Sequence, residues 1–510
     1  MAARPRISKL GASLGLCALL AAAGAAASGS LPELLERNDR AAALAAIGNG
    51  GDVNERSADG TTALHWAVHQ GDLELVKQLL AHGADPNTRN DYGSTPISEA
   101  GVEGDFGIVK ALLDAGADAG SPNAEGQTVL MVVARTGHVE TAKLLLDHGA
   151  DPNAREEWGE QTALMWAASQ QQPGMIRVLL EHGAAVDARA REQNWQRKVT
   201  AEPRIKFMQN GGFTALLYAA REGCGECVKA LVAGGADINL ADPDGMTPLV
   251  LALYNRNFDT AGVLVEQGAD VNQWDWWGRG PLYMAIELNQ IPASRRGDLP
   301  SADRLSGLDV ARMLLERGAR VNMRLREQPP LRNEPGDRGF VDGTPDTLVI
   351  NTGATALHPA AKASDDAAIK LLLEHGADPS VPNVFGITPV MAAAGVGHLY
   401  GIFKPYPTIG RFKTGAQAVA TMKLLVAAGA SLDVRSQQVA AEFQKKPLAG
   451  LTPAHGAARE GWSEVIQYLH DAGADIDAKT TSPDQSTPRD LAAAKGHDET
   501  VALIDKLLAR

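Results

Sequence analysis

The chain has 510 residues, of which 45% are hydrophobic, 21% charged and 5% aromatic, and its formal net charge at pH 7 is −13. This length admits several ordinary domains or one elongated array. The acidic balance argues against a nucleic acid partner, because phosphate binding needs clustered Lys and Arg that displace counterions. The 53 glycines and the scarcity of aromatic residues favour short helices separated by turns.

The N-terminal segment 1–27 has the three parts of a secretory signal peptide. Basic residues precede Leu10, an apolar run follows as far as Ala23, and the alanines at 25–27 offer a small-residue cleavage site. The apolar run is shorter than the roughly 20 residues that a membrane-spanning helix needs. We therefore expect an exported protein, periplasmic or otherwise secreted, with no membrane span in the mature chain.

Beyond this leader the sequence repeats itself. Copies without inserted residues are 33 to 35 residues apart, and in seven copies the tripeptide Gly-Ala-Asp begins 21 residues after the opening residue. Two landmarks held at one offset indicate a single repeating unit. The opening residues are Thr62, Thr95, Thr128, Thr162, Thr214, Thr247, Gly280, Thr355, Thr388, Thr452 and Thr487.

Each repeat has the signals of two short helices. Thr-Pro pairs such as Thr95-Pro96 are typical of a helix start, where the hydroxyl caps free amides and Pro takes the first helical position. A second helix follows after a Gly, as predicted from Leu73 to Ala81 by apolar residues at helical spacing. Helices of this length are not stable alone in water, so the repeats must bury their apolar faces against one another.

The consensus resembles the ankyrin repeat family, and Thr62-Ala63-Leu64-His65 followed by Gly83-Ala84-Asp85 matches it almost throughout. The short Ala-rich leader makes the chain more similar to exported bacterial ankyrin proteins than to cytosolic eukaryotic ones. The resemblance implies an all-α solenoid of about 12 stacked units, terminal caps included. Each unit would have two antiparallel helices and a projecting β-hairpin turn, with a concave groove along the array.

The predicted organisation follows the phase of the repeat. It comprises a signal peptide (1–27), a degenerate N-terminal capping repeat (28–60), repeats one to four (61–186), a basic insert (187–212), repeats five and six (213–278), repeat seven with two inserts (279–353), repeat eight (354–386), repeat nine with two inserts (387–450), repeat ten (451–485) and a C-terminal capping repeat (486–510).

The inserts differ in composition from the repeats. The basic insert contains Trp195, and the insert between the two helices of repeat nine combines basic residues with Tyr400, Phe403 and Tyr406. Basic residues mixed with aromatic ones are typical of protein interfaces. The inserts are therefore predicted to contact a partner, and the alternative is that they fold back onto the solenoid.

A second set of candidates lies on the repeats themselves. The residue four positions after the opening residue is expected to face the groove, and it is large and apolar in several repeats. Exposed apolar patches are rarely without function, so a partner-binding surface is predicted, with packing against neighbouring repeats as the alternative. The groove residues are Trp66, Trp166, Tyr218, Leu251 and Met284, and the turn residues are Trp158, Trp276 and Trp277.

Motifs that carry chemistry are few. Ten of the twelve histidines recur at repeat positions, which assigns them structural hydrogen bonds rather than metal binding. Cys224 and Cys227 stand three residues apart at the start of a second helix, a spacing that allows a disulfide, simple packing or a redox-active pair. No phosphate-binding Gly loop, Ser elbow or paired-carboxylate motif is present, so no catalytic residue, cofactor or metal is predicted.

The sequence therefore favours a non-catalytic scaffold of the periplasm or cell exterior, monomeric, that binds another protein through the groove and the long inserts. Two alternatives stay open: a glycan or small-ligand binder that uses the groove aromatics, and a thiol-redox accessory that uses Cys224 and Cys227. The identity of the partner does not follow from the fold.

Overall fold

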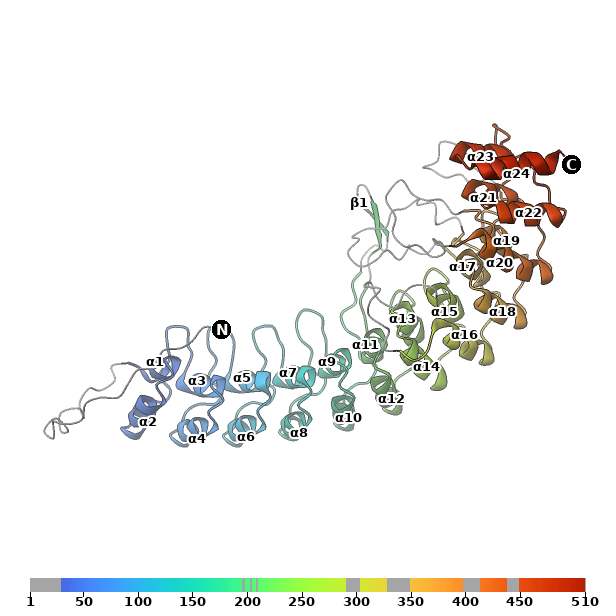
Figure 1. Cartoon of the computed structure of the whole chain (residues 1–510). Helices are drawn as coiled ribbons and strands as arrows, with labels where there is room; N and C mark the ends of the chain where they lie inside the picture. The colour runs from blue at the N-terminus through green and yellow to red at the C-terminus, as the bar shows by residue number, and fades with distance from the viewer. Residues whose placement is uncertain are drawn as a thin grey trace, which may run out of the picture. The chain divides into compact units, whose positions relative to one another are not determined.

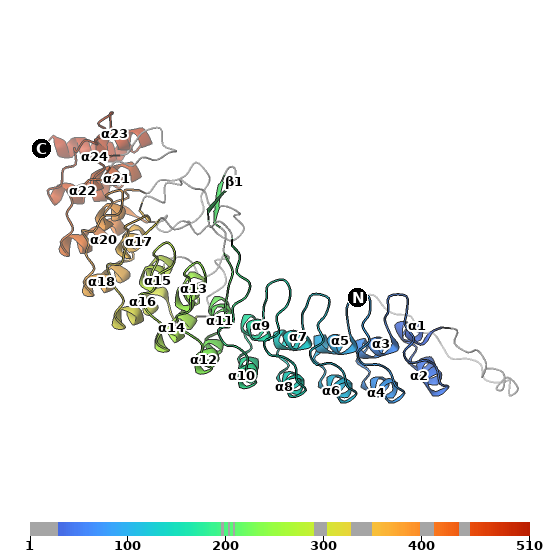
Figure 2. The ribbon, with the colours of Figure 1, turned by 180° about the vertical axis from the view of Figure 1, so that it is seen from behind.

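The computed structural model describes residues 29–194, 210–289, 303–327, 349–397, 413–437 and 449–509, together with the backbone of two short strands between 198 and 207. These residues contain 24 helices in twelve successive pairs (Figures 1 and 2). The chain divides into two compact parts, an N-terminal unit (Met1–Val133 and Glu140–Asp151) and a C-terminal unit (Ala134–Val139 and Pro152–Arg510). The predicted all-α solenoid of about twelve repeats is confirmed.

The N-terminal unit holds the first three helix pairs, and the fourth lies at the boundary. The helices are α1 (Leu31–Glu36), α2 (Arg40–Gly48), α3 (Ala63–His69), α4 (Leu73–Ala81), α5 (Pro96–Glu103), α6 (Phe106–Asp114), α7 (Val129–Thr136) and α8 (Val139–Asp147).

The C-terminal unit holds the remaining eight pairs. They are formed by α9 (Ala163–Ser169), α10 (Pro173–Glu181), α11 (Ala215–Glu222), α12 (Gly225–Ala233), α13 (Pro248–Tyr254), α14 (Phe258–Glu266), α15 (Pro281–Asn289), α16 (Gly307–Glu316), α17 (Leu357–Ala363), α18 (Asp366–Glu374), α19 (Pro389–Ala393), α20 (Gly415–Ala427), α21 (Pro453–Glu460), α22 (Ser463–Asp471), α23 (Pro488–Lys495) and α24 (Asp498–Leu508).

Local sequence signals start and end these helices as predicted. In α5, Pro96 takes the first position and Thr95 Oγ1 accepts a hydrogen bond from the amide of Ser98 at 3.4 Å. The helix ends at Gly104, whose φ of 67° is left-handed, a conformation that Gly adopts with little strain. Helix α4 spans Leu73–Ala81, the range predicted from its apolar spacing.

The pairs stack in chain order. In the C-terminal unit each first helix packs on the next first helix, as α9, α11 and α13 do, and each second helix packs on the next second helix. We call the side formed by the first helices α9 to α23, together with residues 134–136 at the end of α7 that belong to this unit, the inner face; Figures 1 and 2 show α9 to α23 opposite the second helices. The buried apolar residues lie between the layers and between neighbouring pairs, so the core is continuous along the unit.

Asparagine side chains in the loops after second helices join neighbouring repeats. Asn87 Nδ2 donates to the carbonyl of Gly116 at 2.9 Å, and its Oδ1 accepts from the amide of Asp118 at 2.8 Å. In the C-terminal unit Asn322 makes the same two bonds to Gly376 and Asp378, at 3.0 and 2.9 Å. Because both partners belong to the next repeat, these bonds stabilise the stack and not the isolated pair.

The turns between repeats form hairpins without regular strands. Consecutive turns contact each other through single backbone bonds, such as Asp91 N to Asp59 O at 2.9 Å, and isolated bridges such as Arg56 with Thr62 close individual turns. The arms of these turns are too short for a ladder. The strands named in the described part, β1 (Lys198–Ala201) and β2 (Arg204–Phe207), pair antiparallel within the basic insert instead.

The helices are short throughout the described chain. The longest is α20, with 13 residues. None of them combines the length and apolarity that crossing a bilayer requires.

Candidate partner-binding surface

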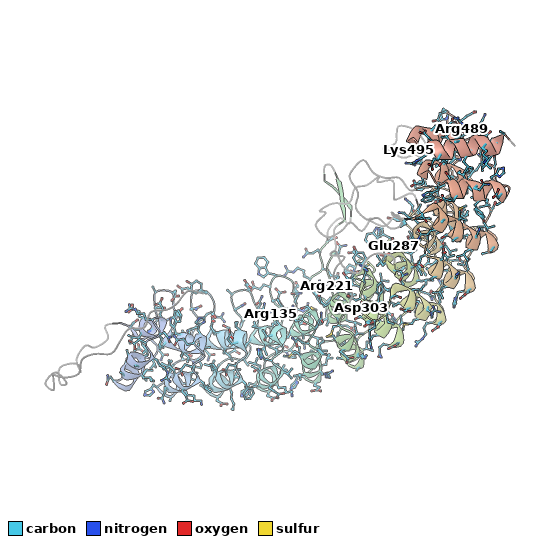
Figure 3. All side chains as sticks on the ribbon, viewed as in Figure 1. Arg135, Arg221, Glu287, Asp303, Arg489 and Lys495 are labelled. Carbon is cyan, nitrogen blue, oxygen red and sulfur yellow. A yellow bond between two sulfur atoms is a disulfide. The ribbon has the colours of Figure 1, made fainter. Side chains whose placement is uncertain are left out.

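Two arginines stack on aromatic rings along the inner face of the C-terminal unit. The guanidinium of Arg135, at the end of α7, lies 5.5 Å from the centroid of the Trp166 ring on α9. Arg221, in the last turn of α11, lies 4.9 Å from the Tyr218 centroid and 5.8 Å from that of Phe213. Figure 3 shows Arg135 and Arg221 on the side of the first helices. These five residues are called the arginine–aromatic strip.

Hydrogen bonds fix part of this strip. Gln161 Nε2 donates to Tyr218 Oη at 2.6 Å, which ties the ring to the loop before α9. Arg221 Nε donates a hydrogen bond to the carboxylate of Glu222 at 2.7 Å, while the guanidinium stacks on the Tyr218 ring. The indole N–H of Trp166 is buried and has no acceptor among the described residues, an arrangement that costs about 1–3 kcal/mol.

Three of the predicted groove residues are buried rather than presented to a partner. Tyr218, Leu251 and Met284 are between 1% and 9% exposed. Leu251 packs in one core cluster with Leu217 and Val250, because neighbouring first helices approach closely enough for this position to reach the adjacent repeat. The expectation of an exposed apolar surface at these three positions is therefore wrong. The alternative, that these side chains pack against neighbouring repeats, agrees with their burial.

The two groove tryptophans remain partly exposed to solvent. Trp66, in the N-terminal unit, is partly exposed and meets the ring of His69 edge-on, with the centroids 5.8 Å apart. Trp166, in the C-terminal unit, is also partly exposed beneath Arg135. Aromatic rings with one open face and a polar neighbour suit protein interfaces.

The turn tryptophans divide into exposed and packed residues. Trp158 is 76% exposed and Trp276 is 47% exposed. Trp277 is partly buried, with its ring 4.8 Å from the guanidinium of Arg279 and its carbonyl accepting from the amide of Arg326 at 2.9 Å. Trp158 and Trp276 are thus the turn residues that a partner could reach, and Trp277 anchors its turn.

A buried ion pair that the sequence did not reveal holds this turn. Arg279 Nε donates to Asp275 at 2.7 Å, both side chains are almost fully buried, and the Tyr254 ring lies 5.2 Å from the guanidinium. The sequence feature that could have indicated this pair is Arg279, which directly precedes Gly280. Gly280 stands at the position where the other repeats have their opening Thr. Breaking a buried pair from one side costs about 3–5 kcal/mol, so Arg279 fixes the turn that presents Trp276.

The candidate residues of the inserts cannot be compared with the structure. Trp195, Tyr400, Phe403 and Tyr406 lie outside the described residues.

The buried histidines have the structural role predicted from their recurrence. In His358, Nδ1 accepts from the amide of Thr355 at 3.0 Å and Nε2 lies 3.0 Å from the carbonyl of Ile387 in the next repeat. His65 and His455 repeat this arrangement. Nδ1 must therefore be unprotonated and Nε2–H must donate, which requires the neutral ring.

Burial keeps these rings neutral. It lowers the pKa of His358 and His455 to about 4 and also lowers the pKa of His65. Among the described residues, no three of His, Cys, Asp and Glu cluster in a way that could hold a metal ion.

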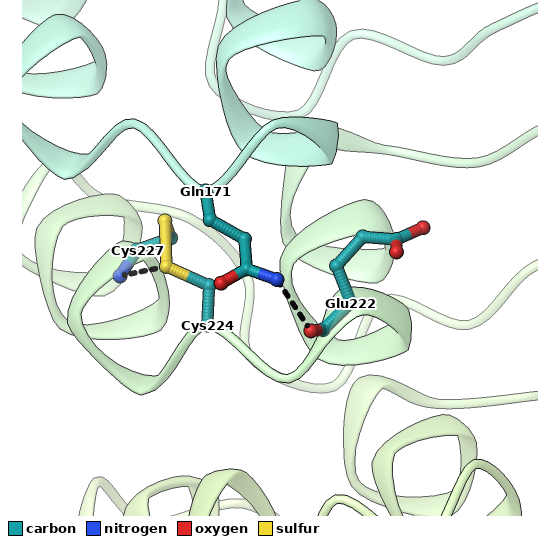
Figure 4. The surroundings of a disulfide bond; sticks show 4 residues. All are labelled: Gln171, Glu222, Cys224 and Cys227. Atoms are coloured by element: carbon teal, nitrogen blue, oxygen red, sulfur yellow. Dashed lines mark hydrogen bonds between the residues drawn. A yellow bond between two sulfur atoms is a disulfide. The ribbon is translucent and has the colours of Figure 1, made fainter. Parts of the chain in front are cut away.

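The two cysteines form a disulfide at the start of α12 (Figure 4). Cys224 is the N-cap, and its Sγ accepts from the amide of Cys227 at 3.1 Å. Gln171, whose side chain lies beside the disulfide in Figure 4, donates to the carbonyl of Glu222 at 3.0 Å. Both sulfurs belong to buried residues, so the bond is placed to brace the loop between α11 and α12.

Twelve stacked helix pairs joined by turn contacts and asparagine bonds define a helical solenoid built from tandem repeats. The family model described as "Ankyrin repeats (3 copies)" matches residues 24–121, 97–190, 198–275 and 216–296, which is more than half of the chain, and the model "Ankyrin repeat" matches 352–384 and 449–481. The chain belongs to the ankyrin repeat family.

Two further comparisons were made. The chain is similar to a structure titled "Crystal structure of human ASB11 ankyrin repeat domain", with 24% identity over 48% of this chain and 99% of that one, at a TM-score of 0.39. No curated protein matches the sequence. Ankyrin repeats are generally protein–protein interaction modules, and the fold is typically a non-catalytic scaffold.

Proposed function

We propose that this protein is an exported, non-catalytic scaffold that binds a protein partner through the inner face of its C-terminal unit. The arginine–aromatic strip supports the proposal best. Arg135 and Arg221 present guanidinium groups above aromatic rings on a chain whose net charge is −13. Arg and aromatic residues dominate the binding energy of protein interfaces.

The chemistry of the strip suits a segment that carries carboxylates. A guanidinium held by a ring can still bind a carboxylate through two parallel hydrogen bonds. Trp158, the most exposed turn tryptophan, would add apolar contact beside the inner face. The long inserts would widen this surface.

A capture experiment with matched variants tests the proposal. The full chain and the Arg135→Ala/Arg221→Ala variant are each crosslinked in an extract of the source cells, and the captured proteins are quantified. The control is Arg177→Ala/Arg312→Ala, which removes two exposed arginines from the second helices α10 and α16. We expect one protein to be enriched by the wild type and the control but not by the strip variant. Equal enrichment by all three, or by none, would contradict the proposal.

Export is the second part of the proposal and has its own test. Cleavage after Ala27 would leave Ser28 as the first residue of the mature protein. N-terminal sequencing of the protein recovered outside the cytoplasm should begin at Ser28. Recovery in the cytoplasm with residues 1–27 still attached would refute this part and leave the partner-binding part standing.

A further inference from the structure

The N-terminal unit carries most of the negative charge of the protein. Residues 29–133 and 140–151 contain 19 Asp and Glu against 7 Lys and Arg, a difference of −12. Residues 134–139 and 152–510, which form the C-terminal unit, contain 42 acidic and 38 basic residues. Such a concentration of one charge on a small part of the chain attracts cationic surfaces and repels acidic ones.

One side of the N-terminal unit is formed by the first helices α1, α3 and α5, with α3 packed between the other two. Figures 1 and 2 show these helices opposite the second helices α2, α4 and α6. The three first helices contain four glutamates and no Lys or Arg, and Arg37 follows directly after α1. We call the surface formed by these five residues the acidic face: Glu36, Trp66, Glu99, Val102 and Glu103.

Apolar side chains lie among the carboxylates of the acidic face. Val102 is 52% exposed. It stands at i+3 from Glu99 and directly before Glu103, so the three residues share one side of α5. Trp66 is partly exposed, and His69 meets its ring edge-on. Exposed apolar residues rimmed by polar ones are typical of interaction sites.

The carboxylates of the acidic face differ from those on the second helices. The side chains of Glu36 and Glu103 are exposed, and neither has a hydrogen-bond or ion-pair partner among the residues that the structure describes. On α4, in contrast, Glu74 pairs with Lys77 at 3.0 Å, and pairs of the same kind lie on α6 and α8. The negative charge is therefore offset locally on the second helices and left open on the first helices.

We propose that the acidic face binds a cationic amphipathic segment of a partner protein. Lys or Arg of this segment would pair with Glu36 and Glu103, its apolar residues would lie against Val102, and a further cation would stack on the open side of Trp66. A helix of about 14 residues is roughly 20 Å long, about the span of three packed helices. The arginine–aromatic strip selects the opposite charge, so either proposal can fail without the other.

Three peptides of one length test the charge requirement. The probe is an amphipathic peptide of about 14 residues made of Lys, Leu and Ala, and its counterparts carry Gln or Glu in place of every Lys. Binding of each labelled peptide to the full chain is followed by fluorescence anisotropy at about 0.15 M salt, where charges more than about 8 Å apart are screened. We expect the Lys peptide to saturate one site, the Gln peptide to bind at least tenfold more weakly, and the Glu peptide not to bind. Equal affinity for the Lys and Gln peptides would overturn the proposal.

Two double variants locate the carboxylates that bind the Lys peptide. Glu36→Gln/Glu103→Gln should weaken its binding by tenfold or more. Glu74→Gln/Asp114→Asn removes the same charge from exposed positions of α4 and α6 and should change the affinity by no more than twofold. Equal weakening in the two double variants would mean that the peptide senses only net charge, which contradicts a defined site.

A charge placed at the apolar centre of the acidic face tests the site without removing a carboxylate. Val102→Arg should weaken binding of the Lys peptide by tenfold or more while the circular dichroism stays that of the wild type, because the side chain is exposed. Val384→Arg adds the same charge at a residue of the C-terminal unit that is 51% exposed and should leave the affinity unchanged. Undiminished binding by Val102→Arg would place the peptide elsewhere and overturn the proposal.

Sedimentation of the protein alone separates a different partner from a second copy of this chain. We expect a monomer at the concentrations of the binding assay, and we expect Arg135→Ala/Arg221→Ala to bind the Lys peptide like the wild type. A dimer that is lost both in this variant and in Glu36→Gln/Glu103→Gln would assign the acidic face to the arginine–aromatic strip of a second copy and overturn the proposal.

Discussion

Acid should destabilise the end of the array through its buried histidines. Fully buried His358 and His455 bridge repeat eight to nine and repeat ten to the C-terminal cap, and each holds a neutral ring between an amide donor and a carbonyl acceptor. Burial lowers the pKa of both residues to about 4, from 6.5 in the unfolded chain. Between these two values the unfolded state binds protons that the folded state does not.

The size and direction of the effect follow from this difference. Above pH 6.5 both states are neutral and the histidines add no pH dependence. As the pH falls from 6.5 to 4, each histidine removes about 3 kcal/mol from the free energy of unfolding, and below pH 4 the loss is complete. Domains are typically stable by about 5–15 kcal/mol, so the combined loss from two such residues, about 6 kcal/mol, is comparable with the lower part of this range.

Urea unfolding followed by circular dichroism at several pH values between 4 and 7 measures this loss. His358→Gln and His455→Gln should each lower stability at pH 7 but flatten the decline toward pH 4 by about 3 kcal/mol. His375→Gln, at an exposed histidine that caps the end of α18, is the matched control. A wild-type stability that is constant from pH 7 to 4, or the same slope in all three variants, would refute the reasoning.

Three other perturbations have defined outcomes. Burial lowers the pKa of Lys413 to about 7, from 10.5 in the unfolded chain. Between pH 7 and pH 10 the unfolded state therefore binds a proton that the folded state has lost, so the stability of the wild type should rise with pH. Thermal unfolding of Lys413→Met should show no such rise. Asn322→Ala removes both bonds to the next repeat and should reduce the free energy of unfolding by about 1–3 kcal/mol in urea, and a change below the error of the measurement would contradict the stacking role. Replacing Cys224 and Cys227 by Ser should lower the free energy of unfolding by no more than about 2 kcal/mol, because the loop that the disulfide closes is very short. A larger loss, measured by calorimetry, would contradict this purely local role of the disulfide.

The fold was predictable because its determinants are local and repeated. Capping Thr, first-turn Pro and closing Gly act within a few residues of each helix end, so the bounds of α4 and the start of α5 follow directly from the sequence. At Gly280, which stands where other repeats have the opening Thr, a Cβ would lie 2.6 Å from Met323 Sδ, so a larger residue there would require that flexible side chain to move. Contacts of this kind, between residues far apart in the chain, cannot be predicted from the repeat pattern of the sequence.

The candidate surface was predicted less well for the same reason. The repeat position of Leu251 and Met284 was read correctly, but exposure depends on how closely the next first helix approaches. Arg135 carries no feature that separates it from other charged residues until its stacking on Trp166 is seen.

Fragment folding tests the central claim, which is that each helix pair is stable only against its neighbours. A fragment of residues 61–93 contains one repeat, and a fragment of residues 29–151 contains the N-terminal helix pairs with their asparagine bonds. The account predicts a helical, cooperatively melting spectrum for the longer fragment and a largely unfolded one for the single repeat. Equal helix content per residue in the two fragments, with a cooperative melt of the single repeat, would contradict it.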